Sequence, residues 1–177
     1  NQAEQAAREG ITQLILIDKN ISSEKLPMPM LLCIGAVNTH LIKLGLRGYV
    51  SINVQTGDAL DTHSFATLIG VGATTVNPYL AFDSLFERYS KKLFGNLSFD
   101  ECVSRFIKSV NLGLLKIMSK MGISVLSSYR GGCNFETVGL SRTIVKDFFP
   151  GVLSKISGIG LTAVSYTHLR AHETSKH

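Results

Sequence analysis

Short apolar runs alternate along the chain with segments of helical periodicity, and this alternation constrains the fold more than any other feature. Apolar runs occupy residues 12–18 (TQLILID) and 48–56 (GYVSINVQT), and a shorter run at 73–79 stops at a proline. The first run is typical of a strand that is buried on both faces of a parallel sheet. The segments between the runs are long enough for crossover helices. The sequence therefore predicts an α/β fold of alternating βα units with a mainly parallel sheet, either an incomplete barrel or an open sheet.

Helical spacing and end signals predict the main helices. Apolar residues recur at helical spacing over 30–44, and Gly45 follows them. A capping box, Ser98 with Glu101, opens the segment with the strongest helical periodicity. Asp58 is expected to cap the helix between the second and third runs. These signals agree with the βα alternation.

The C-terminal third is expected to hold a fourth strand at 123–128 (ISVLSS), a short helix near Phe135 and another helix over 141–148. Polar residues 128–130 (Ser, Tyr, Arg) follow where this strand would lead into a helix. In open α/β folds, ligands and partner surfaces lie at the carboxyl ends of the strands. This stretch is therefore the first candidate for a site.

The Arg130 turn allows two interpretations. Arg130 and the backbone amides of Gly131 and Gly132, placed at a helix entrance, would be able to bind an anion or a carboxylate. An ordinary strand-to-helix turn with a solvated arginine fits the same pattern. Both interpretations stay open at this point.

Composition excludes several classes of protein. A chain of 177 residues with 45% hydrophobic residues is expected to form one domain, and it lacks an apolar run of the about 18 residues that a membrane span needs. The net charge is +5, but basic residues are scattered and only Lys91 and Lys92 are adjacent, so nucleic acid is not an expected partner. Cys33, Cys102 and Cys133 lie far apart, which indicates neither a disulfide framework nor a zinc site. A reducing cytoplasm fits this cysteine usage.

No residue pattern indicates chemistry within the chain. GVG at 70–72 ends a helix instead of opening one, so it is not a dinucleotide-binding motif. Asp61 and His63 are two apart on a helix and point in different directions. Cys33 and His40 would share a helix face, but two ligands make a poor metal site, and buried structural roles are expected for them. We expect no catalytic, cofactor-binding or metal-ligating residue.

The end of the chain is unlike the rest. Residues 164–174 read VSYTHLRAHET and match, residue for residue, a translation of a transposase adaptor used in DNA sequencing libraries. Segments of this kind are excluded from reasoning about folds. We therefore expect one domain over residues 1–163, cut at both ends, and an artefactual, disordered tail over residues 164–177.

Several longer stretches carry a resemblance to a known family. They are REGITQLILIDKN, PMPMLLCIGAVNTHLI, LIGVGATTVNPYLAFDSL, SVNLGLLKIMSKMGISVLSSYRGGCNFETVGL and GIGL. In order and approximate spacing they resemble the central domain of the glutamate synthase large subunit, over about residues 6–162 of this chain. KIMSKMGIS followed by SYRG, and VNPYLA after a glycine-rich helix end, are the most specific matches.

The resemblance implies a non-catalytic role in a larger enzyme. Glutamate synthases transfer the amide nitrogen of glutamine to 2-oxoglutarate and reduce the product, which yields two glutamates. In this family an amidotransferase domain with a cysteine nucleophile releases ammonia, which passes through a tunnel to a flavin-binding barrel that carries FMN and a three-iron iron–sulfur cluster. Electrons come from NAD(P)H through a small subunit, or from ferredoxin. The central domain lies between the two active sites and has a structural role.

The resemblance also implies partners and a contact surface. The chain lacks the nucleophilic cysteine, the closely spaced cluster cysteines and the flavin barrel, so it is expected to be inactive by itself and to bind no cofactor. The implied partners are the amidotransferase and flavin domains of the same parent chain, which Ser128, Tyr129, Arg130 and Glu136 would contact. A free-standing barrel-type enzyme or a binding module for a phosphorylated small molecule stays open as the alternative.

Overall fold

The computed structural model describes residues 2–19, 28–164 and 166. The elements follow the chain in this order: α1 (Gln2–Arg8), β1 (Gln13–Ile17), α2 (Met30–Lys43), the short 3-10 helix η1 (Arg47–Tyr49), β2 (Ser51–Gln55), α3 (Thr62–Val71), β3 (Thr75–Asn77), α4 (Tyr79–Ser90), α5 (Phe99–Lys120), α6 (Leu126–Tyr129), β4 (Glu136–Leu140), α7 (Arg142–Phe148) and β5 (Leu153–Ile159). The expected disordered tail lies almost entirely outside the described residues. Val164, at its start, packs against a buried cluster around α7.

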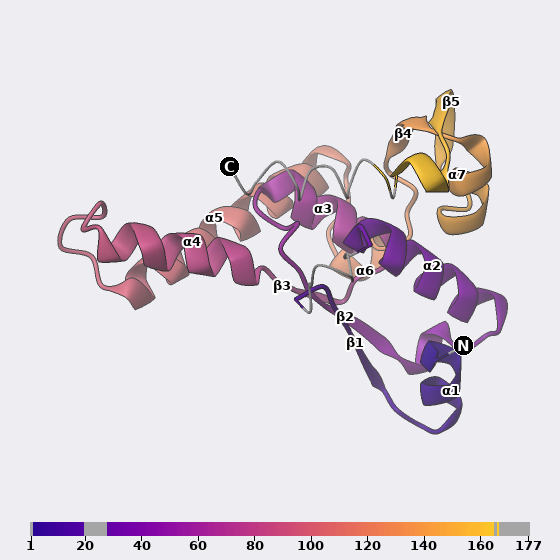
Figure 1. Ribbon diagram of the computed structural model, residues 1–177, viewed down its shortest axis with the longest axis horizontal. Helices are drawn as coiled ribbons and strands as arrows, with labels where there is room; N and C mark the ends of the chain where they lie inside the picture. Colours follow the sequence, from indigo (N-terminus) through magenta and orange to yellow (C-terminus); the bar gives the residue numbers. More distant parts are fainter. Residues whose placement is uncertain (1, 20–27, 165, 167–177) are drawn as a thin grey trace.

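Three parallel strands form the centre of the molecule in the order β1-β2-β3 (Figure 1). Leu14 pairs with Ile52, and Val54 pairs with Val76, without a break in register. Because α2 connects β1 to β2 and α3 connects β2 to β3, the predicted alternation of parallel βα units is confirmed. Within the described residues, no helix has the length and apolar character that crossing a membrane would require.

Both connecting helices cover the same face of this sheet. Ile34 of α2 and Leu68 of α3 pack against Ile52 of β2, which has no exposed surface. The opposite face is open, since Ile15 and Ile17 of β1 are 62% and 51% exposed. The expectation that β1 is buried on both faces is therefore wrong for this chain. A consecutive strand order with helices on one side is the arrangement of a barrel, but the described strands form no closed barrel.

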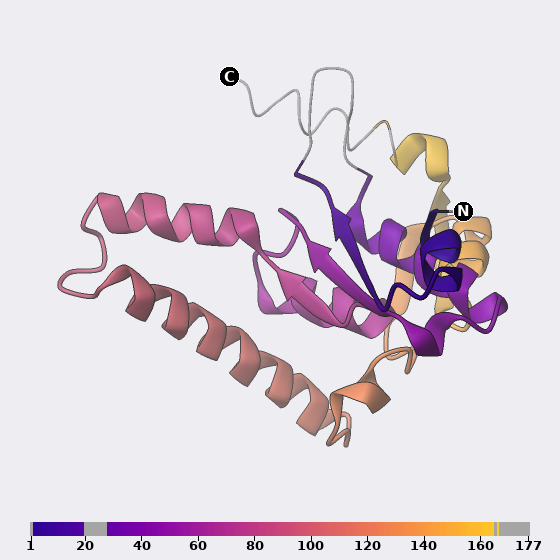
Figure 2. The same cartoon turned by 90° about the horizontal axis from the view of Figure 1, so that it is seen from below.

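The two longest helices of the second half extend away from the sheet as an arm. Figure 2 shows α4 and α5 running side by side to a turn far from the strands. The predicted capping box is present: the Ser98 amide donates to Glu101 at 2.8 Å, and the Glu101 amide donates to the Ser98 hydroxyl at 3.3 Å. Aromatic rings join the helices, with the centroids of Phe86 and Phe99 5.5 Å apart.

The C-terminal third departs from the sequence-based expectation. Residues 123–128 do not form a strand, since the chain enters α6 at Leu126. Periodicity cannot distinguish a short apolar run in a strand from one in a helix, and here packing of Tyr129 against Ile69 and Met118 decides the conformation. The helix expected near Phe135 is also wrong, because β4 begins there. The helix over 141–148 is confirmed as α7, which Ser141 caps.

β4 and β5 form a second, separate parallel pair, with α7 as the crossover. This unit lies beside α2, on the opposite side of the molecule from the α4–α5 arm (Figure 1). Its own cluster of buried residues includes Ile144 and Phe149, and Leu32 of α2 completes it. The molecule is thus mixed α/β, with parallel strands in two small sheets.

Candidate functional site

Polar groups meet at the carboxyl ends of β1 and β2. The Asp18 carboxylate, directly after β1, accepts hydrogen bonds from the Thr56 hydroxyl at 2.5 Å and from the Gly57 amide at 3.1 Å. The Thr56 hydroxyl in turn accepts a hydrogen bond from the Asp58 amide at 3.0 Å, and Thr56 has no exposed surface. Parallel strands bring these groups together because their carboxyl ends lie on the same edge of the sheet. We call Asp18, Thr56, Gly57 and Asp58 the edge cluster.

Asp58 does not cap α3 as the sequence predicts. Its carboxylate accepts a hydrogen bond from the Met30 amide at 3.1 Å, at the first turn of α2. That helix follows Pro29, which has no side-chain acceptor to offer. The cap of α3 is Asp61, which accepts from the Ser64 amide at 2.8 Å. Asp58 therefore connects the edge of the sheet to α2. Its carboxylate accepts a hydrogen bond from a first-turn amide of that helix, 28 residues away in sequence.

Three further side chains surround the edge cluster. Burial and the neighbouring Asp18 carboxylate raise the pKa of Tyr79, the first residue of α4. The Lys19 ammonium lies 5.5 Å from the centre of the Tyr79 ring. Burial, and then the charges of Asp18 and Asp58, raise the pKa of the Cys33 thiol, which therefore stays protonated near neutral pH. Because a thiol is a weak nucleophile, this environment is unsuited to cysteine catalysis.

The segment at 128–130 is not the exposed cluster that its sequence predicts. Tyr129 is 1% exposed, and its hydroxyl donates a hydrogen bond to the Ala66 carbonyl at 3.2 Å. It is a core residue of this chain, and its contact with a neighbouring domain stays a prediction. Ser128 is exposed, Arg130 is half-buried, and Glu136 is exposed on β4, where its carboxylate pairs with Lys155 at 2.9 Å. For these three residues the contact also stays a prediction.

The glycines after Arg130 do not form an anion-binding turn. The Gly131 amide donates to the Gly70 carbonyl at 2.8 Å, and the Gly132 amide donates to the Tyr129 carbonyl at 3.2 Å. No helix begins at this point, because the chain continues into β4. The amides of Gly131 and Gly132 therefore do not take part in binding a phosphate or a carboxylate, since both already have acceptors.

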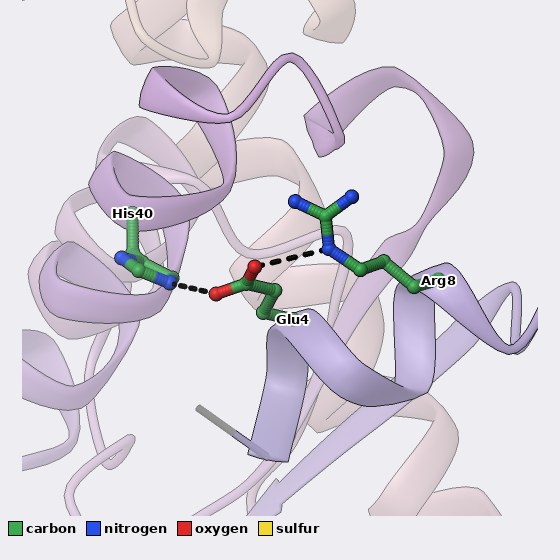
Figure 3. Close-up of polar contacts among 3 residues, drawn as sticks. All are labelled: Glu4, Arg8 and His40. Atoms are coloured by element: carbon green, nitrogen blue, oxygen red, sulfur yellow. Dashed lines mark hydrogen bonds and ion pairs between the residues drawn. The ribbon is translucent and has the colours of Figure 1, made fainter.

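His40 is not the buried residue that its place in an apolar helix suggests. Figure 3 shows the Glu4 carboxylate of α1 between His40 of α2 and Arg8. One oxygen of Glu4 lies 3.0 Å from His40 Nε2, and the other lies 3.0 Å from Arg8 Nε. The His40 side chain is 43% exposed. Hydrogen bonds from His40 and then Arg8 lower the pKa of Glu4. The Glu4–His40 contact connects α1 to α2. Cys33 lies about two helical turns from His40 on α2 and takes no part in it.

A cavity of about 300 Å³ lies between α2, α3 and the segment that leads through β4 to α7. Its lining includes Val71, Phe135, Leu140 and Phe148, so its surface is largely apolar. The sequence gives no sign of this cavity, because its walls come from two segments, 31–71 and 131–152, that only the tertiary fold brings together. In the sequence, apolar residues that line a cavity look the same as apolar residues that fill the core.

The described residues contain no group of three or more histidine, cysteine or acidic side chains that could hold a metal ion. Cys33, Cys102 and Cys133 lie on α2, on α5 and in the turn before β4. An iron–sulfur cluster needs several thiolates at one place, so these cysteines do not fit one. The edge cluster is likewise a set of groups that bond one another and hold the elements together.

Comparison with known proteins gives a consistent match. Residues 1–141 match the family model described as the glutamate synthase central domain. The chain is 50% identical over 174 residues to the NADPH glutamate synthase large chain of Azospirillum brasilense, which covers 98% of this chain and 12% of that relative. It is 43% identical over 171 residues to the NADPH glutamate synthase large chain of Bacillus subtilis (strain 168), covering 97% and 11%.

A relative from a plant shows the same relation. The chain is 42% identical over 170 residues to the chloroplastic ferredoxin-dependent glutamate synthase of Spinacia oleracea, covering 90% of this chain and 10% of that relative. The chain therefore spans only 10–12% of the length of these three relatives.

Proposed function

Because the chain belongs to the glutamate synthase central domain family, we propose that it works as a non-catalytic part of a longer glutamate synthase. In that role it joins the amidotransferase domain to the flavin-binding domain and keeps the two reaction centres at a fixed separation. The observation that carries the proposal is the family match over residues 1–141. The parent enzyme would form two glutamates from glutamine and 2-oxoglutarate.

A scaffold role is supported by the polar groups of the chain, which form hydrogen bonds with one another. Asp18, Thr56 and Asp58 bond one another or a helix end, and the Arg130 turn uses its amides internally. The open face of the β1–β3 sheet carries Ile15 and Ile17, which other parts of a parent chain would cover. These features suit a domain that is held between neighbours.

The cofactors and partners of the parent enzyme belong to other domains in this proposal. FMN and the three-iron cluster would be held outside this chain, because its cysteines do not fit a cluster. The electron donor would be NAD(P)H, through a small subunit, or ferredoxin, in line with the names of the relatives. Ser128, Arg130 and Glu136 would lie at the contact with a neighbouring domain, in a cytoplasmic enzyme.

A grafting experiment tests the proposal. Residues 1–163 of this chain replace the matching segment of the Azospirillum brasilense large chain, to which the chain is 50% identical. We expect the chimaera to keep glutamine-dependent glutamate formation, with little ammonia released per glutamine hydrolysed. A chimaera that folds, hydrolyses glutamine and reduces free ammonia plus 2-oxoglutarate, but no longer couples the two reactions, would show that this chain cannot act as the connecting domain.

The isolated chain provides the control for the alternative function. FMN and sugar phosphates are titrated into the purified 177-residue chain, and binding is followed by fluorescence and calorimetry. The scaffold proposal expects no saturable binding. Saturable binding of either ligand would favour a free-standing enzyme or binding module.

A further inference from the structure

Arg47 is a half-buried arginine whose hydrogen bonds go only to neutral groups. Its Nε donates to Asn38 Oδ1 at 2.6 Å, one terminal nitrogen donates to the Val50 carbonyl at 2.6 Å, and the other donates to the Gly72 carbonyl at 2.9 Å. These bonds fix the guanidinium between η1 and the C-terminal end of α3. No carboxylate of a described residue neutralises it.

The backbone of Arg130 also lies near the C-terminal end of α3. The Gly131 amide bonds to the Gly70 carbonyl, which places the backbone of Arg130 beside the last turn of that helix. Arg130 is half-buried, and its Nε is enclosed without a hydrogen-bond partner in the described structure. Buried polar groups without partners are rare, because each one loses its hydrogen bonds to water and gains none in exchange.

The two guanidinium groups act on each other as like charges. Burial and the charge of Arg130 lower the pKa of Arg47. The carbonyl end of α3 compensates a part of this positive charge, because a helix C-terminus carries a partial negative charge. That partial charge is about half an elementary charge, which is less than the charge of two guanidinium groups.

We propose that Arg47 and Arg130 form a binding site for one carboxylate group that another segment of the parent chain supplies. The inference rests on the proposed function, which places most of a much longer chain around this one. A carboxylate is the group that guanidinium groups recognise best among protein side chains, because its two oxygens accept parallel hydrogen bonds. Arg47 has remaining N–H groups after its three bonds, and the Nε–H of Arg130 has no acceptor among the described residues.

An internal carboxylate fits the place of the site better than a free anion. The site lies where η1, the end of α3 and the turn after α6 meet, so three segments of the domain surround it. The chain spans 12% of the Azospirillum relative, so most of the carboxylates of a parent enzyme lie outside it. A carboxylate from a neighbouring domain would thus connect that domain to the centre of this one.

The test uses the full-length chimaera with Arg130→Met, Arg130→Lys and the exposed control Arg142→Met. We expect Arg130→Met to lower the melting temperature of the chimaera by at least about 2 °C, because it removes one of the two positive charges that pair with a covered carboxylate. Arg130→Lys should recover part of the loss because it restores the charge, and Arg142→Met should have little effect. Equal behaviour of Arg130→Met and Arg142→Met would overturn the proposal.

The pH dependence separates a carboxylate partner from simple packing. In the Arg130→Met variant the carboxylate keeps only Arg47 as a partner, so its folded-state pKa is higher than in the unchanged chimaera, and the variant loses less stability as the pH falls and the group takes up a proton. In the unchanged chimaera the paired carboxylate has a lowered pKa, so it gains nothing from the same pH change. The difference in melting temperature should therefore shrink as the pH falls from about 7 to about 4, where carboxylates take up protons, whereas a difference that is constant over this range would contradict the proposal.

Two further readouts complete the test. Sulfate added at constant ionic strength should not alter the difference in melting temperature between the chimaera and its Arg130→Met variant. If sulfate changed this difference, the site would bind free anions, and the proposal of an internal carboxylate would be overturned. Failure of this inference is distinguishable from failure of the proposed function, because coupled glutamate formation by the unchanged chimaera tests only the latter.

Discussion

The two parallel sheets of this molecule differ in how well they are buried. β1, β2 and β3 pair in continuous register, and Ile52 and Val54 of the middle strand are 0% and 2% exposed. β4 and β5 pair with register shifts, and Val138 and Ile156 are 64% and 60% exposed. Both sheets are built from the same kind of βαβ unit, so the topology does not explain the contrast.

This contrast indicates that the helices packed on a sheet contribute more to its stability than the pairing of its strands does. Two helices, α2 and α3, cover one face of β1–β3, whereas α7 alone packs on β4–β5 and leaves their apolar side chains exposed. Since burial of apolar surface is the main favourable term in folding, the first sheet should be the more stable region. The second sheet should depend on neighbours in a parent chain.

The largest expected effect tests this contrast directly. Ile52→Ala removes a fully buried side chain and should lower the free energy of unfolding by about 2–5 kcal/mol. Ile156→Ala is the matched change on the exposed sheet and should alter it by less than about 0.5 kcal/mol. Urea denaturation of the chain, followed by circular dichroism, measures both values. Equal losses would mean that the two sheets contribute alike.

The next prediction concerns the junction between the two regions. A Cβ at Gly35 of α2 would lie 2.6 Å from a ring carbon of Phe149 and 2.7 Å from the Phe148 carbonyl oxygen. Gly35→Ala should therefore push α7 away from α2 and lower the free energy of unfolding by about 1–3 kcal/mol. Gly48→Ala is the control, because a Cβ there meets no atom within 4 Å. Hydrogen exchange should show the loss of protection mainly in α7 and β5 if the junction is the weak point.

A third substitution tests the edge cluster. Thr56→Val removes the hydroxyl that donates to Asp18 and accepts from the Asp58 amide, so two hydrogen bonds of the edge cluster are lost. The expected loss is about 1–3 kcal/mol of unfolding free energy. Thr12→Val, at an exposed position before β1, is the matched control. Similar midpoints for both variants in urea would show that the cluster contributes little to stability.

The smallest expected effect is a pH dependence at α1. Hydrogen bonds from His40 and Arg8 lower the pKa of Glu4 below its ordinary value of 4.5. The stabilisation is therefore present above about pH 4.5 and is lost as the pH falls through the lowered folded-state pKa. Hydrogen exchange of α1 between pH 3 and 7, corrected for intrinsic rates, should show this loss, and Glu4→Gln should remove the dependence. Exposure of the pair keeps the effect small.

Local signals predicted those parts of the fold that depend on neighbours in sequence. Ser98 and Glu101 form the predicted capping box because both partners lie within one helical turn. The parallel strands β1, β2 and β3 follow from apolar runs that end at turn residues. Asp58 shows the limit: the sequence predicts that it caps α3, but it accepts a hydrogen bond from the amide of Met30 at the start of α2, 28 residues away in sequence, while Asp61 caps α3.

The site proposed at Arg47 and Arg130 could be predicted only in part, because it too depends on contacts between distant segments. The sequence identified Arg130 as an unusual polar residue, but it placed Tyr129 at the surface, where packing against Ile69 and Met118 buries it. Arg47 gave no signal in the sequence, since nothing local distinguishes it from a solvated arginine. Its importance appears only where the end of α3 brings it toward Arg130.

By itself, the sequence determined the family, the βα alternation and the helix ends, because periodicity and capping act over a few residues. The tertiary structure alone decided which face of the sheet is open, where α6 replaces a strand, and which distant segments, those of Arg47 and Arg130, lie at the same end of α3. These features depend on contacts between distant segments, whose free energy outweighs local preference when a side chain such as Tyr129 can be buried.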